Sequence, residues 1–175
     1  AMSSLGCIPA AHAKQDCTNG TIDQYDCVLD NTQNLTISNG VTFSNDGTRA
    51  ALRYQFVDQD NMGDLGAGQT LTNNGNISAV GDGSSEDIFN NNNALLGFNW
   101  IATPLAGVHI DNELLGTLNN NGSISASDTA TGSLHAIATG VFEGSPIAMQ
   151  GTLNNAVGAS ISATAAAEDG NSFAA

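Results

Sequence analysis

A short phrase recurs three times in the chain, and this repetition constrains the fold more than any other feature. It reads TLTNNGNISAV at residues 70–80, TLNNNGSISAS at 117–127 and TLNNAVGASISAT at 152–164. Each copy joins a leucine to an Asn-rich corner and then to an alternating Ile–Ala segment. Such a repeat predicts similar layers that stack on one another, because one layer cannot bury its apolar face alone.

The alternating segments predict β-strands with one buried face. Ile124 and Ala126 alternate with serines, and a strand places successive side chains on opposite faces. The Asn and Gly residues between the two strands of each phrase tolerate the backbone of a tight corner. Residues 34–45 (NLTISNGVTFSN) follow the same pattern. We expect inward stacks of Leu35, Ile37, Val41, Phe43, Leu71, Ile77, Leu118, Ile124, Leu153 and Ile161.

The sequence therefore predicts an all-β fold, a parallel β-helix (β-solenoid). Stacking places equivalent side chains about 4.8 Å apart, and it lets asparagines at one corner form a ladder of amide hydrogen bonds. Leu71, Leu118 and Leu153 are 47 and 35 residues apart, and we interpret each interval as about two turns. A β-sandwich is the alternative, because its strands also alternate, but it does not require a repeated phrase.

We expect an N-terminal Cys-containing capping segment over residues 1–33 and β-helix coils over 34–175, with an insertion near 90–107. The insertion contains Trp100 and the densest apolar cluster of the chain. We interpret it as a loop packed on the solenoid or as an exposed patch for self-association or receptor contact. The sequence stops partway through a further repeat, so we expect it to be truncated at the C-terminus.

The charge balance excludes several partners. The chain has 17 acidic and 3 basic residues, a net charge of −14. Nucleic acids and anionic membrane surfaces are bound by clustered Lys and Arg, which this chain cannot supply. No apolar run reaches the roughly 18 residues of a membrane span, so we expect no membrane insertion by this segment. The excess of acidic residues fits the surface of a secreted protein.

Three cysteines lie ten residues apart near the N-terminus: Cys7, Cys17 and Cys27. They predict one disulfide and an oxidising compartment. We favour the pair Cys17–Cys27 and place Cys7–Cys17 second. A zinc site that includes His12 is a weaker interpretation, because no cysteine pair has the usual spacing.

Two acidic segments are candidate metal sites. In VHIDNELL, residues His109, Asp111 and Glu113 share one face of a strand and would suit a metal. We favour the simpler interpretation that these three side chains face water opposite a buried apolar face. The loop from Asp58 to Asp64 partly matches an EF-hand, and we favour a solvated acidic turn over a calcium site there.

Catalytic chemistry finds little support in the sequence. A polysaccharide lyase or glycosidase needs an acid–base set, and the candidates are two arginines near the N-terminus and three carboxylates in a polar loop. Serine–histidine chemistry has no specific signal around His135. We assign no catalytic residue, no cofactor and no metal ligand. The residues weighed are Arg49, Arg53, Asp82, Glu86 and Asp87.

The tandem segments LTNNGNISAVGDGS and GTLNNNGSISAS, after NLTISNGVTFSNDG, resemble passenger domains of bacterial autotransporters, the type V secreted proteins of Gram-negative bacteria. The resemblance covers roughly residues 17–175. It implies a right-handed parallel β-helix at the bacterial cell surface, with a role in adhesion, aggregation or biofilm formation. We therefore expect a non-enzymatic adhesin or stalk that binds an extracellular glycan, a surface protein or itself. The alternatives are a carbohydrate-active β-helix and a self-assembling extracellular fibre subunit.

Overall fold

A computed structural model describes residues 27–29, 34–44, 50–54, 64–83, 104–132, 136–144, 150–170 and 172–175. This part of the chain is all-β, and its strands form three parallel sheets. Within these residues no helix is long and apolar enough to cross a membrane.

In the described residues, the three sheets, called A, B and C, contain thirteen strands. Sheet A contains β1 (Cys27–Leu29), β4 (Ala50–Tyr54), β7 (Leu105–Ile110), β10 (Ala136–Glu143) and β13 (Ser172–Ala174). Sheet B contains β2 (Leu35–Ile37), β5 (Thr70–Asn73), β8 (Thr117–Asn120) and β11 (Thr152–Asn155). Sheet C contains β3 (Thr42–Ser44), β6 (Asn76–Gly81), β9 (Ser123–Ala130) and β12 (Ser160–Ala167).

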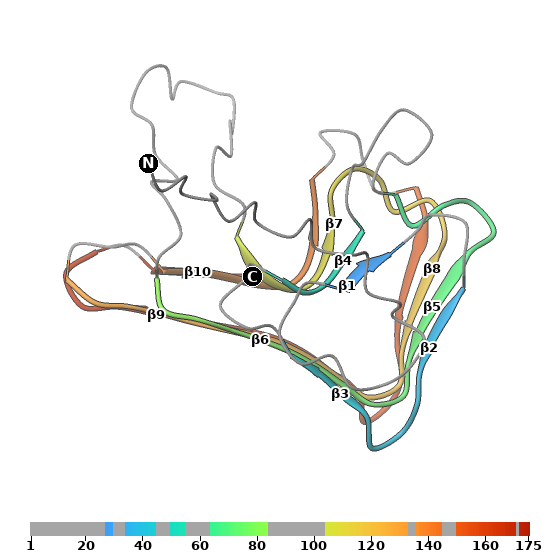
Figure 1. The fold of residues 1–175 in the computed structure, drawn as a ribbon, viewed down its shortest axis with the longest axis horizontal. Coiled ribbons are helices and arrows are strands. Elements are labelled where there is room, and N and C mark those ends of the chain that lie inside the picture. Colours follow the sequence, from blue (N-terminus) through green and yellow to red (C-terminus); the bar gives the residue numbers. More distant parts are fainter. Residues whose placement is uncertain are drawn as a thin grey trace, which may run out of the picture.

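Along the chain, successive strands belong to sheets A, B and C in a fixed, repeating order. Each strand is hydrogen-bonded to the strand three places further along the sequence, as in the order β2, β5, β8, β11. Figure 1 looks along the resulting stack: sheet B forms one side, sheet C forms the base, and sheet A lies over sheet C. The β1 strand lies inside the segment predicted as a cap and pairs with β4.

Successive copies of the repeated phrase lie directly on one another. Leu118 is paired with Leu71 on one side and with Leu153 on the other. Each interval between phrases is therefore one passage through the three sheets, and the prediction of about two turns is wrong. The strands of sheet A have no sequence motif in common, so the sequence did not reveal that each turn includes one of them.

Two of the predicted inward columns, from Leu35 to Leu153 and from Phe43 to Ile161, are confirmed in register, whereas Ile37 is paired with Asn73. Leu71, Leu118, Ile77 and Ile124 are fully buried, and Leu35 and Phe43 of the first layer are also buried. Burial fails at the last layer, where Leu153 is 37% exposed and Ile161 is half-buried. The reason is that β11 and β12 are the outermost strands of their sheets. The remaining predicted residues are Ile37, which is buried, and Val41, which is half-buried.

Small residues let sheet A approach sheet C. A Cβ atom added at Gly107 would lie 2.6 Å from Cγ2 of Ile124, and one added at Gly140 would lie 2.5 Å from Cγ2 of Ile161. Alanines such as Ala126 occupy other inward positions of this narrow part. The Ile–Ala order within each phrase thus matches a core that narrows away from sheet B (Figure 1).

Candidate functional site

The corner between sheets B and C contains a buried ladder of asparagine amides, as the sequence predicts. Nδ2 of Asn73 donates to Oδ1 of Asn120 at 2.8 Å, and Nδ2 of Asn120 donates to Oδ1 of Asn155 at 2.7 Å. Asn120 also donates to the backbone oxygen of Ser160 at 2.9 Å. Asn73 and Asn120 are fully buried. The ladder satisfies polar groups that the corner would otherwise bury without partners.

A second set of ladders runs along the outer surface of the same strands. Nδ2 of Asn121 donates to Oδ1 of Asn74 at 2.9 Å, and Oγ of Ser123 donates to Oδ1 of Asn76 at 2.7 Å. Oγ of Ser125 lies 3.2 Å from Oγ of Ser78 in the adjacent layer. These contacts hold exposed polar side chains in fixed rows.

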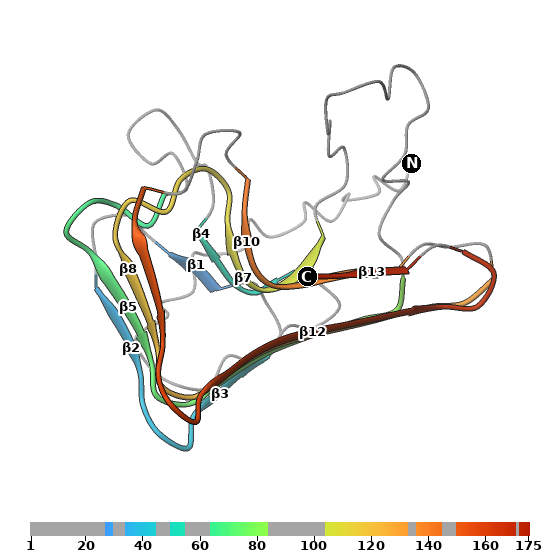
Figure 2. The same ribbon diagram turned by 180° about the vertical axis from the view of Figure 1, so that it is seen from behind.

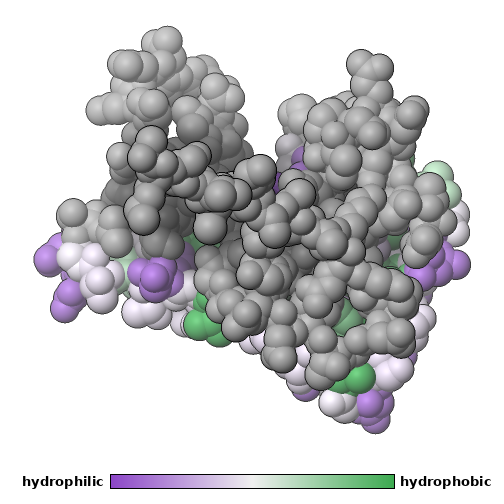
Figure 3. Space-filling model, in the orientation of Figure 1, coloured by the Kyte–Doolittle hydropathy of each residue, from purple (hydrophilic) through white to green (hydrophobic). Residues whose placement is uncertain are grey.

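The outward faces of sheets B and C carry hydroxyl and amide groups and no charge. The outward residues of β5, β8 and β11 are Thr or Asn. Those of β6, β9 and β12 are Ser, Thr and Asn, with one Val and one Ala. The margin formed by these sheets in Figure 3 is accordingly mostly white and purple. We call these two surfaces the hydroxyl faces.

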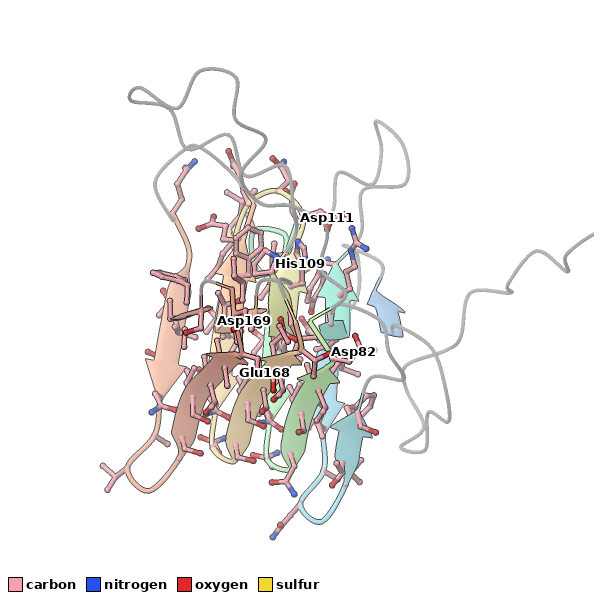
Figure 4. All side chains as sticks on the ribbon, turned by 90° about the vertical axis from the view of Figure 1, so that its left-hand side faces the viewer. Asp82, His109, Asp111, Glu168 and Asp169 are labelled. Atoms are coloured by element: carbon pink, nitrogen blue, oxygen red, sulfur yellow. The ribbon has the colours of Figure 1, made fainter. Side chains whose placement is uncertain are left out.

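Sheet A contains a different kind of cluster, made of Arg53, Asp111 and His109. Nε and Nη2 of Arg53 donate to Oδ1 and Oδ2 of Asp111 at 2.9 and 3.2 Å. Nε2 of His109 lies 3.2 Å from Oδ1 of the same carboxylate. Arg53 and His109 are register neighbours on β4 and β7, so the sheet itself brings them together. Figure 4 shows His109 and Asp111 side by side, away from the other labelled carboxylates.

The cluster holds His109 neutral. Its side chain is 4% exposed, and its ring meets that of Phe142 edge-on at 4.9 Å. Burial, reinforced by the positive charge of Arg53 and opposed by Asp111, lowers the pKa of His109 to about 4. With Nε2 donating to Asp111, Nδ1 is an acceptor that has no hydrogen-bond partner among the described residues. The arrangement orients an imidazole, as an Asp–His pair does in acid–base chemistry.

The favoured interpretation of VHIDNELL is wrong for His109, which is buried and does not face water. Strand β7 ends at Ile110, so the alternation stops before Asp111 and Glu113. Glu113 is not drawn into the cluster; its backbone N–H donates to Oδ1 of Asp64 at 2.9 Å. In the described part of the chain, no group of three or more His, Cys, Asp or Glu side chains is arranged to hold a metal ion.

Asp128 is a buried carboxylate that was not predicted from the sequence. It points inward from β9, is 2% exposed, and accepts from the backbone N–H groups of Gly83 and Ile137, both at 2.8 Å. A Cβ at Gly81 would lie 2.7 Å from Oδ1 of Asp128, so this glycine leaves room for the carboxylate. The available signal was an aspartate at an inward position of the alternating pattern SISASDTA. Its contacts indicate a structural role.

Asp82, a candidate considered above, is exposed. Glu168 accepts from the backbone N–H of Gly132 at 3.3 Å, which fastens a turn. Several predictions lie outside the described residues and stay predictions. These are the disulfide with Cys7 and Cys17, the Trp100 segment, the loop before Asp64, and the roles of His12, Arg49, Glu86, Asp87 and His135. The side chain of Cys27 is likewise not described.

Comparisons with protein-family models, curated proteins and solved structures give no match to this chain.

Proposed function

We propose that the chain is a right-handed parallel β-helix from the passenger region of a bacterial surface protein. The rotation of the chain through three parallel sheets supports the β-helix. Connections between parallel strands of one sheet are right-handed in about 98% of cases, which supports the hand. The resemblance of the repeated phrases to autotransporter passengers supports the location at the cell surface.

The proposed function is non-enzymatic adhesion, in which the hydroxyl faces bind an extracellular glycan. The observation that carries this proposal is the absence of charge on the outward positions of sheets B and C in a chain of net charge −14. Fixed hydroxyl and amide groups form hydrogen bonds with sugar hydroxyls. Each contact is weak, and repetition along the stack raises the overall affinity through high effective concentration.

The charge of the whole molecule selects among glycans. Acidic polysaccharides are repelled by the net negative charge, whereas neutral ones are not. We therefore expect binding to neutral, hydroxyl-rich glycans, and we expect that binding to depend little on ionic strength.

A glycan array probed with the purified chain tests the proposal. The first variant replaces Ser78, Ser125 and Ser162, one column of sheet C, with alanine; the matched variant replaces Thr70, Thr117 and Thr152 of sheet B with valine. Both keep the core intact, which circular dichroism and the unfolding midpoint verify. Of these two variants, we expect the one whose altered face contacts the glycan to bind it at least about tenfold more weakly. Binding to no neutral glycan, or equal binding by all three proteins, would overturn the proposal.

A further inference from the structure

Asparagine is followed directly by glycine at three of the described corners between sheets B and C. An asparagine side chain reacts with its own backbone most readily before glycine, because glycine has no side chain to shield its nitrogen. The same reactive pair thus occurs in three successive layers of one molecule. The pairs are Asn39–Gly40 between β2 and β3, Asn74–Gly75 between β5 and β6, and Asn121–Gly122 between β8 and β9.

The first of these corners is longer than the next. Ile37 is paired with Asn73, and Thr42 is paired with Asn76, so the strands are joined by residues 38–41 in the first layer and by residues 74–75 in the second. Figure 2 shows the blue connection from β2 to β3 reaching beyond the green connection from β5 to β6. A layer stacked on the first one with a shorter corner therefore leaves the end of the longer corner in solvent.

The extra residues of the first corner form a turn whose tip makes no contact with the stack. The N–H of Val41 donates to the carbonyl of Ser38 at 3.1 Å, and Gly40 has φ 80°. Asn39 is exposed, and a Cβ added at Gly40 would meet nothing within 4 Å. Among the described residues, neither the Asn39 side chain nor the Gly40 N–H has a hydrogen-bond partner. The two groups that would react with each other are therefore both accessible.

The other two corners are held by the layers beside them. The N–H of Gly75 donates to Oδ1 of Asn73 at 3.1 Å, and Nδ2 of Asn121 donates to Oδ1 of Asn74 at 2.9 Å. A Cβ added at Gly75 would overlap the backbone of the first layer, and one added at Gly122 would overlap the carbonyl of Gly75. The reacting atoms of these corners can approach each other only after local opening of the stack.

We propose that Asn39 is a site of spontaneous deamidation in the folded chain, and that stacking protects Asn74 and Asn121. The backbone nitrogen of Gly40 loses its proton and attacks Cγ of Asn39, which forms a carbon–nitrogen bond and closes a succinimide ring. The bond between Cγ and the side-chain nitrogen breaks, and this nitrogen leaves as ammonia after taking up one proton. Water then opens the ring at either carbonyl and gives aspartate or isoaspartate.

The product differs from the original chain in charge and in backbone length. One added negative charge takes the net charge from −14 to −15, and it appears at the corner between the two hydroxyl faces. The isoaspartate form also adds a methylene to the backbone. We expect the unfolding midpoint to stay the same, because the tip of this turn makes no bond to the stack. The reaction does not require a bound glycan, so it holds or fails independently of glycan binding.

The three asparagines serve as controls for one another in a single experiment. The folded chain is incubated in mildly alkaline buffer, and peptide mapping with mass spectrometry follows the conversion of each asparagine. A sample taken at the start corrects for reaction during digestion. We expect Asn39 to convert at least about tenfold faster than Asn74 and Asn121, because opening their corners breaks hydrogen bonds. A parallel incubation in urea removes the stacking, and we expect the three rates to become similar there.

Two glycine variants test the role of the attacking nitrogen. Gly40→Ala places a methyl group beside this nitrogen and should slow the conversion of Asn39 by at least about tenfold. The matched control is Gly158→Ala, because Gly158 has φ 86° and an added Cβ there also meets nothing within 4 Å. This control strains a similar turn and should leave the conversion of Asn39 unchanged. Circular dichroism shows whether each variant is folded.

Three results would overturn the proposal. The first is a folded chain in which Asn39 converts no faster than Asn74 and Asn121. The second is a difference that persists in urea, which would assign it to the neighbouring residues in the sequence and not to the fold. The third is an unchanged rate at Asn39 in folded Gly40→Ala. If that variant does not fold, the comparison of folded and urea-treated wild type decides.

Discussion

Asn73 and Asn120 lie one above the other at the corner between sheets B and C, with Nδ2 of Asn73 2.8 Å from Oδ1 of Asn120. Both side chains are fully buried. A slip of one residue between the two strands would break this contact and move every inward side chain to the outer face. The asparagine pair therefore specifies the register of the stack.

Replacing Asn120 with alanine should destabilise the fold strongly. The change removes the acceptor of Asn73 and the donor to both Asn155 and the Ser160 carbonyl. We expect a loss of about 3 kcal/mol in the free energy of unfolding, because buried polar groups lose their partners. Urea denaturation measures this loss. The matched control is Asn121→Ala, whose exposed amide bonds to Asn74, and it should cost less than about 1 kcal/mol. Equal losses would contradict the role of burial.

Two glycines with positive φ angles should respond differently to alanine. Gly83 has φ 74° and Gly132 has φ 64°, so both substitutions strain the backbone. An added Cβ at Gly83 would overlap the backbone of Ala130, whereas the one at Gly132 meets nothing within 4 Å. We expect Gly83→Ala to cost more than about 3 kcal/mol and Gly132→Ala about 1 kcal/mol. Thermal unfolding of the two variants compares them, and similar midpoints would refute the close packing at Gly83.

The buried His109 should make stability depend on pH. Its pKa is lowered from 6.5 to about 4, so the unfolded chain binds a proton more readily than the folded chain. Stability from this group is therefore fully present above pH 6.5 and falls as pH decreases toward 4, by up to about 3 kcal/mol. The variant His109→Gln does not titrate and keeps a donor toward Asp111. Denaturation at several pH values should show a shallower slope for the variant in this window; parallel curves would contradict the assignment.

The sequence predicts sheets B and C well because their strands repeat. Leu71 and Leu118, and likewise Ile77 and Ile124, occupy equivalent places in a phrase, so their stacking follows from the alternation of one strand and the need to bury its apolar face. The buried amide ladder follows from asparagines at equivalent corner positions. These features are local in the phrase and need no knowledge of the rest of the chain.

Sheet A could not be predicted in the same way. Its strands AALRY, LAGVHI and AIATGVFE share no pattern, and β7 is buried on both faces, so alternation does not reveal its orientation. The contact between Arg53 and Asp111 joins residues 58 apart and depends on the register of β4 with β7. For the same reason the burial of His109 was missed. The length of one turn was also misjudged, because the sheet A strands within it went unrecognised.

The most direct test of the stacking is a disulfide between layers, because each interval between phrases makes one passage through the three sheets. Ser125 and Ser162 are paired in register on adjacent strands, so their Cα atoms should lie about 4.8 Å apart. This separation suits a disulfide, which spans about 4.4–6.8 Å between Cα atoms.

Oxidation of Ser125→Cys/Ser162→Cys, followed by peptide mapping with mass spectrometry, should therefore give a cross-link between the two positions. The matched control is Ser78→Cys/Ser162→Cys, which lies two layers apart at about 9.6 Å and should not cross-link. A missing bridge between 125 and 162, or equal bridging in the control, would contradict the one-turn repeat.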